Sequence, residues 1–125
     1  MILDTNAISA LFEGDRGLAD ALENCPRLSL PVIAIGEYRY GLKRSRHRQQ
    51  LAPLLDTLIA ESEVLEIDEA TTVAFAAVRD HLRAAGRPIP ENDVWIAALS
   101  RQYQLPVLSL DSHFDGVPDL VRISW

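Results

Sequence analysis

Four acidic side chains in this sequence, Asp4, Glu37, Asp93 and Asp111, occupy positions where carboxylates could do chemistry together. Carboxylates that converge without compensating bases repel one another and raise one another's pKa. Divalent cations such as Mg²⁺ or Mn²⁺ remove this conflict, because they prefer oxygen ligands and are commonly held by a few carboxylates. Such an ion activates a bound water and stabilises the charge of an attack on phosphorus. The four acids therefore indicate metal-dependent phosphodiester or phosphoryl chemistry.

Two of these acids, Asp4 and Asp111, directly follow short apolar segments at residues 1–3 and 106–110. If both segments are parallel strands, the two side chains reach the carboxyl edge of the sheet, where α/β folds bind ligands. Each acid also has an ordinary structural interpretation. Asp4 is a good helix N-cap and Asp111 a good turn residue, so both interpretations stay open at this point.

The other two acids, Glu37 and Asp93, lie in predicted helices on faces that pack inward. Glu37 is about two turns inside its helix, too deep for the helix dipole to favour it. A carboxylate there needs a basic partner or a metal, unless it is a glutamate that reaches solvent. Asp93 is in the first turn of its helix, where the dipole alone favours an acid, but Ile96 and Ala97 follow on the same face.

Short strands alternate with helices along the chain. Strands are predicted at residues 1–3, 28–30, 64–67 and 106–110, with a last edge strand at 121–124. Helices are predicted at residues 7–12, 15–23, 31–45, around the leucines 51–58, 69–83 and 91–103. Pro53 either lies in the first turn of its helix or kinks it. This alternation predicts an α/β fold with a parallel sheet covered on both faces.

Length and composition favour one globular domain. The chain has 125 residues, of which 48% are hydrophobic, and this is enough for one core and excludes global disorder. Eighteen acidic and 12 basic residues give a net charge of −6. Proteins that hold nucleic acid by bulk charge are positive, so any contact with RNA or DNA needs a local basic patch or metal ions held by the acids.

The sequence predicts a soluble cytoplasmic protein. Cys25 is the single cysteine, which excludes an internal disulfide and a paired-cysteine metal site. No apolar run approaches the ~18 residues of a membrane span. The N-terminus has no basic region before an apolar one, and Asp4 interrupts the place of a signal peptide's apolar segment.

Four segments of the chain together resemble a known family: LDTN at 3–6, EYRYG at 37–41, PENDVWIAA at 90–98 and LSLDSHF at 108–114. In this order they are similar to PIN-domain ribonucleases, specifically the VapC toxins of bacterial toxin–antitoxin pairs. The resemblance spans essentially the whole chain, and the segment at 90–98 is its most characteristic part. It implies a single PIN domain over residues 1–125, a three-layer α/β/α sandwich around a short central parallel sheet.

The resemblance also implies an activity and its residues. The chain would be an endoribonuclease that depends on Mg²⁺, with Mn²⁺ also active, and that hydrolyses RNA with a metal-activated water. The catalytic acids, which are also the metal ligands, fall on Asp4, Glu37, Asp93 and Asp111. The residues that support these ligands fall on Asn6, Ser109 and, as an extra acid, Asp115.

Basic residues gather in the segment 43–48. The candidates for RNA binding are Arg39, Lys43, Arg44, Arg46 and Arg48. If the helix of Glu37 continues through this segment, Arg44 and Arg48 lie on the glutamate's side, where they could bind phosphates near the acids. A solvated turn is the alternative. The resemblance adds a cognate antitoxin docking across the same groove, a homodimer, and a heterotetramer or larger assembly with the antitoxin.

The three histidines are not assigned to the metal. His47 belongs to the basic segment, His81 is near a helix end where the dipole favours a cation, and His113 is in the turn after Asp111.

Two other functions remain open. An aspartyl-phosphate enzyme could use Asp4, but Asn6 stands where such enzymes place a second aspartate. A non-catalytic RNA-binding or partner-binding PIN-like domain would keep the fold without the chemistry. The sequence does not specify which RNA is cut, or where.

Overall fold

A computed structural model describes all 125 residues, from Met1 to Trp125. Five short strands form one parallel sheet in the order β3-β2-β1-β4-β5. Their bounds are β1 (Ile2–Leu3), β2 (Ser29–Pro31), β3 (Glu63–Leu65), β4 (Val107–Leu108) and β5 (Arg122–Ile123). The chain adds β2 and β3 on one side of β1 and then returns to add β4 and β5 on the other. The strand order therefore reverses between β1 and β4, the point at which open α/β sheets bind ligands.

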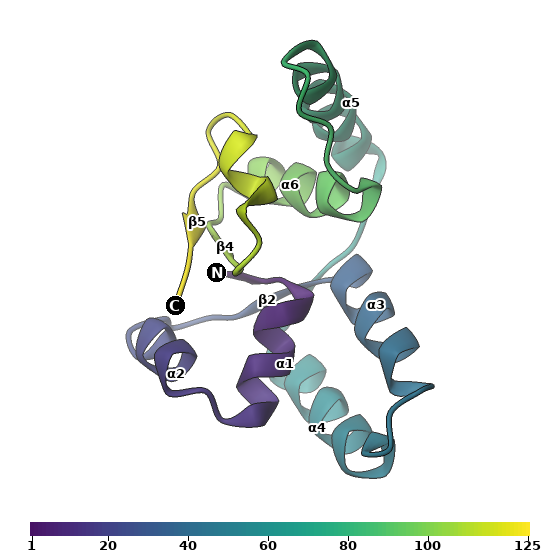
Figure 1. Cartoon of the computed structure of the whole chain (residues 1–125), viewed down its shortest axis with the longest axis vertical. Coiled ribbons are helices and arrows are strands. Elements are labelled where there is room, and N and C mark those ends of the chain that lie inside the picture. Colours follow the sequence, from purple (N-terminus) through teal and green to yellow (C-terminus); the bar gives the residue numbers. More distant parts are fainter.

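Helices cover both faces of the sheet. They are α1 (Thr5–Glu13), α2 (Arg16–Leu22), α3 (Val32–Leu42), α4 (Arg48–Glu61), α5 (Glu69–Ala84), α6 (Glu91–Tyr103) and the 3₁₀ helix η1 (Ser112–Gly116). Figure 1 shows α1 to α4 on one side of the strands and α5, α6 and η1 on the other. None of the helices combines the length and hydrophobicity needed to span a lipid bilayer. The predicted three-layer α/β/α architecture is confirmed.

The two faces of the sheet belong to two separate cores, because side chains alternate along a strand. Leu3 and Leu108 pack into the core made with α1, α3 and α4. Their strand neighbours Ile2 and Val107 pack into the core made with α5, α6 and η1. All four side chains are fully buried. Both central strands are thus fixed from above and below, which holds their carboxyl ends in register.

Most predicted elements are found, and the clearest difference is the end of α3. The helix ends at Leu42 rather than near residue 45, and Pro31 ends β2 instead of beginning the helix. The amides of Lys43 and Arg44 bond three residues back, to Tyr40 and Gly41, so the chain leaves the α-helix in a tight turn.

The early end of α3 makes one prediction wrong. Arg44 and Arg48 do not continue the Glu37 face of the helix, since Arg44 lies in the turn and Arg48 begins α4. Pro53 is neither in the first turn nor at an end, but inside α4.

The central strand β4 allows a matched test of core packing. We expect Leu108→Ala to lower the free energy of unfolding by about 2–5 kcal/mol, because it leaves a cavity in a fully buried site. Leu110→Ala, two residues along and 53% exposed, should change it by less than about 0.5 kcal/mol. Urea unfolding of both variants makes the comparison. Equal losses would contradict the assignment of Leu108 to the core.

Candidate active site

The carboxyl ends of β1 and β4 bring Asp4 next to the segment that leads to Asp111. The strands pair directly, with Leu3 opposite Leu108, and the Asp4 amide continues the ladder by donating to the Leu108 carbonyl at 3.2 Å. Asp4 is only 5% exposed. Its Oδ1 also accepts from the Thr5 amide at 2.8 Å, so it caps α1 as well as facing the site.

A polar network holds the Asp4 carboxylate in one orientation. Ser109 Oγ donates to Asp4 Oδ2 at 2.7 Å, and Asn6 Nδ2 donates to the same oxygen at 3.2 Å. Asn6 Oδ1 accepts from the Leu110 amide at 3.2 Å, and Ser109 Oγ accepts from the Asp111 amide at 2.9 Å. The two residues predicted to support the ligands therefore contact Asp4 and shape the loop of Asp111.

Asp93 and Asp111 meet around a histidine. His113 Nδ1 lies 2.9 Å from Asp111 Oδ1 and 3.3 Å from Asp93 Oδ2. One ligand atom from each of these three residues falls within 4.8 Å of the others, a spacing that suits a metal ion. Asp93 comes from the first turn of α6, whereas Asp111 caps η1 through a bond from the His113 amide to its Oδ1.

Glu37 borders the cluster through Thr5. The Thr5 hydroxyl donates to Glu37 Oε2 at 2.8 Å, while its amide donates to Asp4. Glu37 is half-buried on α3, and its charge contributes to raising the pKa of Asp4. One residue of α1 therefore links a carboxylate from α3 with one that follows β1.

The electrostatics of the cluster show an excess of negative charge. Burial and then the charge of Asp4 raise the pKa of Asp93 to about 6. Burial also raises the pKa of Asp4, against the lowering effect of its bonds from Ser109 and Thr5. Raised carboxylate pKa values in a recess are typical of functional sites. The fold thus gathers acids that lack a sufficient counter-charge among the protein's own side chains.

Comparison with family models decides the identity of the fold. Residues 1–120 match the model described as "PIN domain". The chain belongs to the PIN domain family. Among curated relatives, it is 34% identical over 129 residues to Ribonuclease VapC5 of Mycobacterium tuberculosis, covering 98% of this chain and 94% of that protein. It is 35% identical over 95 residues to Ribonuclease VapC4 of the same organism, covering 74% and 73%.

Solved structures agree with this PIN fold. The VapBC-5 complex of M. tuberculosis, of the VapBC family of toxin–antitoxin systems, contains a chain that is 28% identical, with a TM-score of 0.80 and coverage of 99% and 97%. VapBC2 of Rickettsia felis, bound to a DNA fragment from its promoter, matches with a TM-score of 0.88 over 99% and 97% of the chains. At 22% identity the second likeness concerns the fold alone. The resemblance drawn from the sequence is confirmed.

Asp115 does not join the acids of this PIN domain. Its carboxylate is held by Arg122 through two bonds, Nε to Oδ1 at 2.7 Å and Nη2 to Oδ2 at 2.9 Å. These bonds keep the pKa of Asp115 below its usual range. Arg122 Nη1 also donates to the Ser109 carbonyl at 3.1 Å. Asp115 is thus linked through Arg122 to the backbone of Ser109, and it makes no bond to Asp4, Asp93 or Asp111.

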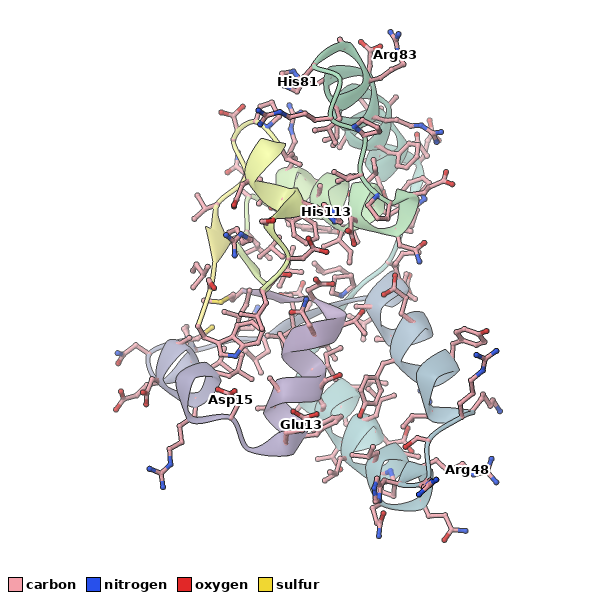
Figure 2. All side chains as sticks on the ribbon, viewed as in Figure 1. Glu13, Asp15, Arg48, His81, Arg83 and His113 are labelled. Atoms are coloured by element: carbon pink, nitrogen blue, oxygen red, sulfur yellow. The ribbon has the colours of Figure 1, made fainter.

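The basic segment lies away from the acids. Arg39, Lys43 and Arg48 line a depression of about 460 Å³ on α3 and α4. Arg44 contacts Tyr40, donating to its hydroxyl at 3.2 Å, and Arg46 is exposed in the turn. Figure 2 shows Arg48 at the far end of the α3–α4 layer from His113. None of the five bases forms an ion pair with the acids of the site, and Arg39 pairs instead with Asp56 of α4 at 3.7 Å.

Sequence reasoning assigned no role to two residues that the fold brings to the site, His113 and Thr5. The available signal was the position of His113 two residues after Asp111, a spacing that lets one turn present both side chains. Thr5 was recognisable only as part of the helix start.

The raised pKa of Asp93 predicts a pH-dependent stability. A carboxyl whose pKa is higher in the folded than in the unfolded chain stabilises the fold at low pH, and this contribution is lost as the pH rises through the folded value. Asn mimics the neutral acid. We therefore expect Asp93→Asn and the unmodified chain to be similarly stable at pH 4, and Asp93→Asn to be the more stable above pH 6.

Urea unfolding in EDTA between pH 4 and 7.5 measures this difference. Asp20→Asn, which removes an exposed carboxylate on α2, is the matched control, and the stability that Asp93→Asn gains as the pH rises is measured against it. Parallel profiles for Asp93→Asn would show that Asp93 titrates normally.

Proposed function

We propose that this chain is an endoribonuclease, the toxin of a toxin–antitoxin pair, which hydrolyses RNA phosphodiester bonds with Mg²⁺ or Mn²⁺. The observation that carries the proposal is the convergence of Asp4, Asp93 and Asp111 where the strand order of the PIN sheet reverses. The names of the curated relatives, Ribonuclease VapC5 and VapC4, support the choice of RNA. An enzyme of this kind acts on cellular RNA, so we expect it in the cytoplasm.

The donor set suits a divalent ion. Carboxylate oxygens are the ligands that Mg²⁺ and Mn²⁺ prefer, and Asp93 and Asp111 offer theirs within 4.8 Å. The raised pKa values of Asp4 and Asp93 mark negative charge that a cation would neutralise. Asp93 and Asp111 would hold the ion, with Asp4 and Glu37 beside it. When bound, the ion supplies a water of lowered pKa and stabilises charge on the phosphate.

The chain's own residues would orient the reaction. Ser109 and Asn6 fix Asp4, so its carboxylate is preorganised and does not rotate away from its neighbours. Thr5 occupies Glu37 Oε2 and leaves Oε1 without a protein donor. We assign Glu37 Oε1 to accept a proton from the attacking water.

A groove leads from Glu37 toward the basic segment. It has a volume of about 300 Å³ and runs along α3 from Glu37 to Ser45, with Phe12, Tyr38 and Leu51 as apolar walls. Solved structures described as toxin–antitoxin complexes or systems share this fold. We propose that an antitoxin segment occupies the apolar groove, and that Arg39, Lys43, Arg44, Arg46 and Arg48 bind RNA phosphates or acidic residues of that partner. A homodimer and larger assemblies with the antitoxin stay predictions from the family.

A non-catalytic binding domain is the alternative function. It requires no metal, whereas the crowded acids of this site favour one. Thermal unfolding with Mn²⁺ separates the two, because a metal-binding site raises the melting temperature with ion concentration and a pure binding module does not.

The catalytic proposal predicts that neutralising single acids abolishes cleavage. Asp4→Asn and Asp93→Asn should each lower the rate of RNA cleavage at least about 100-fold, because each removes charge that holds the ion and stabilises the transition state. Gel analysis of a structured RNA with Mg²⁺ or Mn²⁺ measures the rate. Asp20→Asn, exposed on α2, is the control and should cleave like the unmodified chain. Cleavage in EDTA, or undiminished cleavage by both variants, would overturn the proposal.

The basic segment predicts a salt-dependent affinity. The double variant Lys43→Gln/Arg48→Gln should raise KM for RNA and reduce the slope of log affinity against log salt by about 1.4, the value for two phosphate contacts to a single strand. The rate at saturating RNA should not change, since both side chains line a depression that contains none of the four acids. Arg16→Gln/Arg83→Gln, on α2 and α5, is the matched control of equal charge. Identical salt slopes would assign the segment to the protein partner instead.

A further inference from the structure

We propose that His113 binds the divalent ion directly through Nδ1, beside Asp93 and Asp111, and that this nitrogen makes the site prefer Mn²⁺ to Mg²⁺. The inference rests on the proposed function for the presence of an ion, and it adds a ligand and a selectivity. Figure 2 places His113 where η1 and α6 meet, which are the elements that carry the two carboxylates.

The spacing of the three donor atoms is the first argument. Two donors that each lie about 2.1 Å from one ion, at right angles, are about 3.0 Å apart. The Nδ1 atom lies 2.9 Å from Asp111 Oδ1 and 3.3 Å from Asp93 Oδ2. These values match neighbouring positions in one coordination sphere. The ring therefore needs no large rotation to act as a ligand with both acids.

The hydrogen-bonding capacity of the ring is the second argument. The Nδ1 atom carries at most one proton, which can point at only one oxygen, yet it lies beside two carboxylates. A cation between the three atoms would accept a lone pair from each of them.

The turn that carries His113 is preorganised. The His113 amide donates to Asp111 Oδ1 at 2.9 Å, so backbone and ring approach the same carboxylate. The next residue, Phe114, is fully buried and anchors η1 in the core with α6. The His113 side chain itself is 49% exposed, which leaves it open to an ion arriving from solvent. The ligand is thus held by a fixed turn yet lies at the surface.

The chemistry of the donors gives the selectivity. Mg²⁺ is a hard ion that prefers oxygen and retains water, whereas imidazole nitrogen favours transition-metal ions. A site with two carboxylates and one imidazole therefore gains more affinity for Mn²⁺ than for Mg²⁺ from the nitrogen. A site made of four carboxylates has no such preference built into it.

Electron spin-echo spectroscopy of the Mn²⁺-loaded protein, without RNA, detects a coordinated nitrogen directly. We expect a ¹⁴N coupling of a bound imidazole in the unmodified chain and in His81→Ala, whose histidine is exposed on α5. The coupling should be absent in His113→Ala. Circular dichroism checks that each variant is folded. No imidazole coupling in the unmodified chain, or the same coupling in His113→Ala, would overturn the proposal.

Calorimetric titration tests the selectivity. The unmodified chain should bind Mn²⁺ at least about 10-fold more tightly than Mg²⁺, and His113→Ala should reduce that ratio by about 10-fold, the lower end of the losses seen when residues that orient metal ligands are removed. Equal losses for both ions would contradict the role of the nitrogen in selectivity.

These measurements are independent of RNA cleavage. A nitrogen-coordinated ion in a chain that cuts no RNA would defeat the ribonuclease proposal and leave the role of His113 intact. Metal-dependent cleavage without nitrogen coordination would support the ribonuclease proposal and overturn the role of His113.

Discussion

Repulsion among carboxylates at the carboxyl edge of the sheet is the constraint on which the rest of this structure depends. Asp4 is almost fully buried, and Asp93 carries a pKa of about 6 because burial and the charge of Asp4 both oppose its ionisation. Replacing one of these buried carboxylates by a neutral side chain would remove the repulsion and raise the free energy of unfolding. The fold instead keeps the acids in place, with hydrogen bonds from Ser109 and Thr5 partly offsetting the burial of Asp4. Functional sites commonly retain such local conflicts.

The site holds together only because both cores fix the sheet. Asp4 follows β1, Asp111 follows β4, Asp93 begins α6 and Glu37 lies within α3, so no two acids come from the same element. Alternating side chains of β1 and β4 pack into opposite cores, which prevents the strands from shifting in register. The convergence of charge is therefore a tertiary property. The acids come together only when the whole domain is folded, and no single helix brings them together.

This origin explains what could be predicted from the sequence. Strong local signals placed α6 at residues 91–103 and the acids at strand ends. The predicted end of α3, near residue 45, was wrong. The segment after Gly41 can form either a further helical turn or a tight turn, and local helix propensity does not decide between the two. His113 was passed over because its partner Asp93 is 20 residues away in the chain, and only the packing of η1 on α6 brings them together. Asp115 pairs with Arg122 because β5, which follows η1, returns to the sheet beside β4.

Separation of charge reconciles the net charge of −6 with a polyanionic substrate. The acids that face the site gather at the strand ends, whereas Arg39, Lys43 and Arg48 line a separate depression on α3 and α4, and Figure 2 shows Arg48 far from His113. Glu37 stands between them, at the mouth of the groove along α3. No lysine or arginine forms an ion pair with the four acids of the site, so these acids keep their need for a cation. Arginines paired with these acids would have satisfied the carboxylates internally and removed the need for a metal.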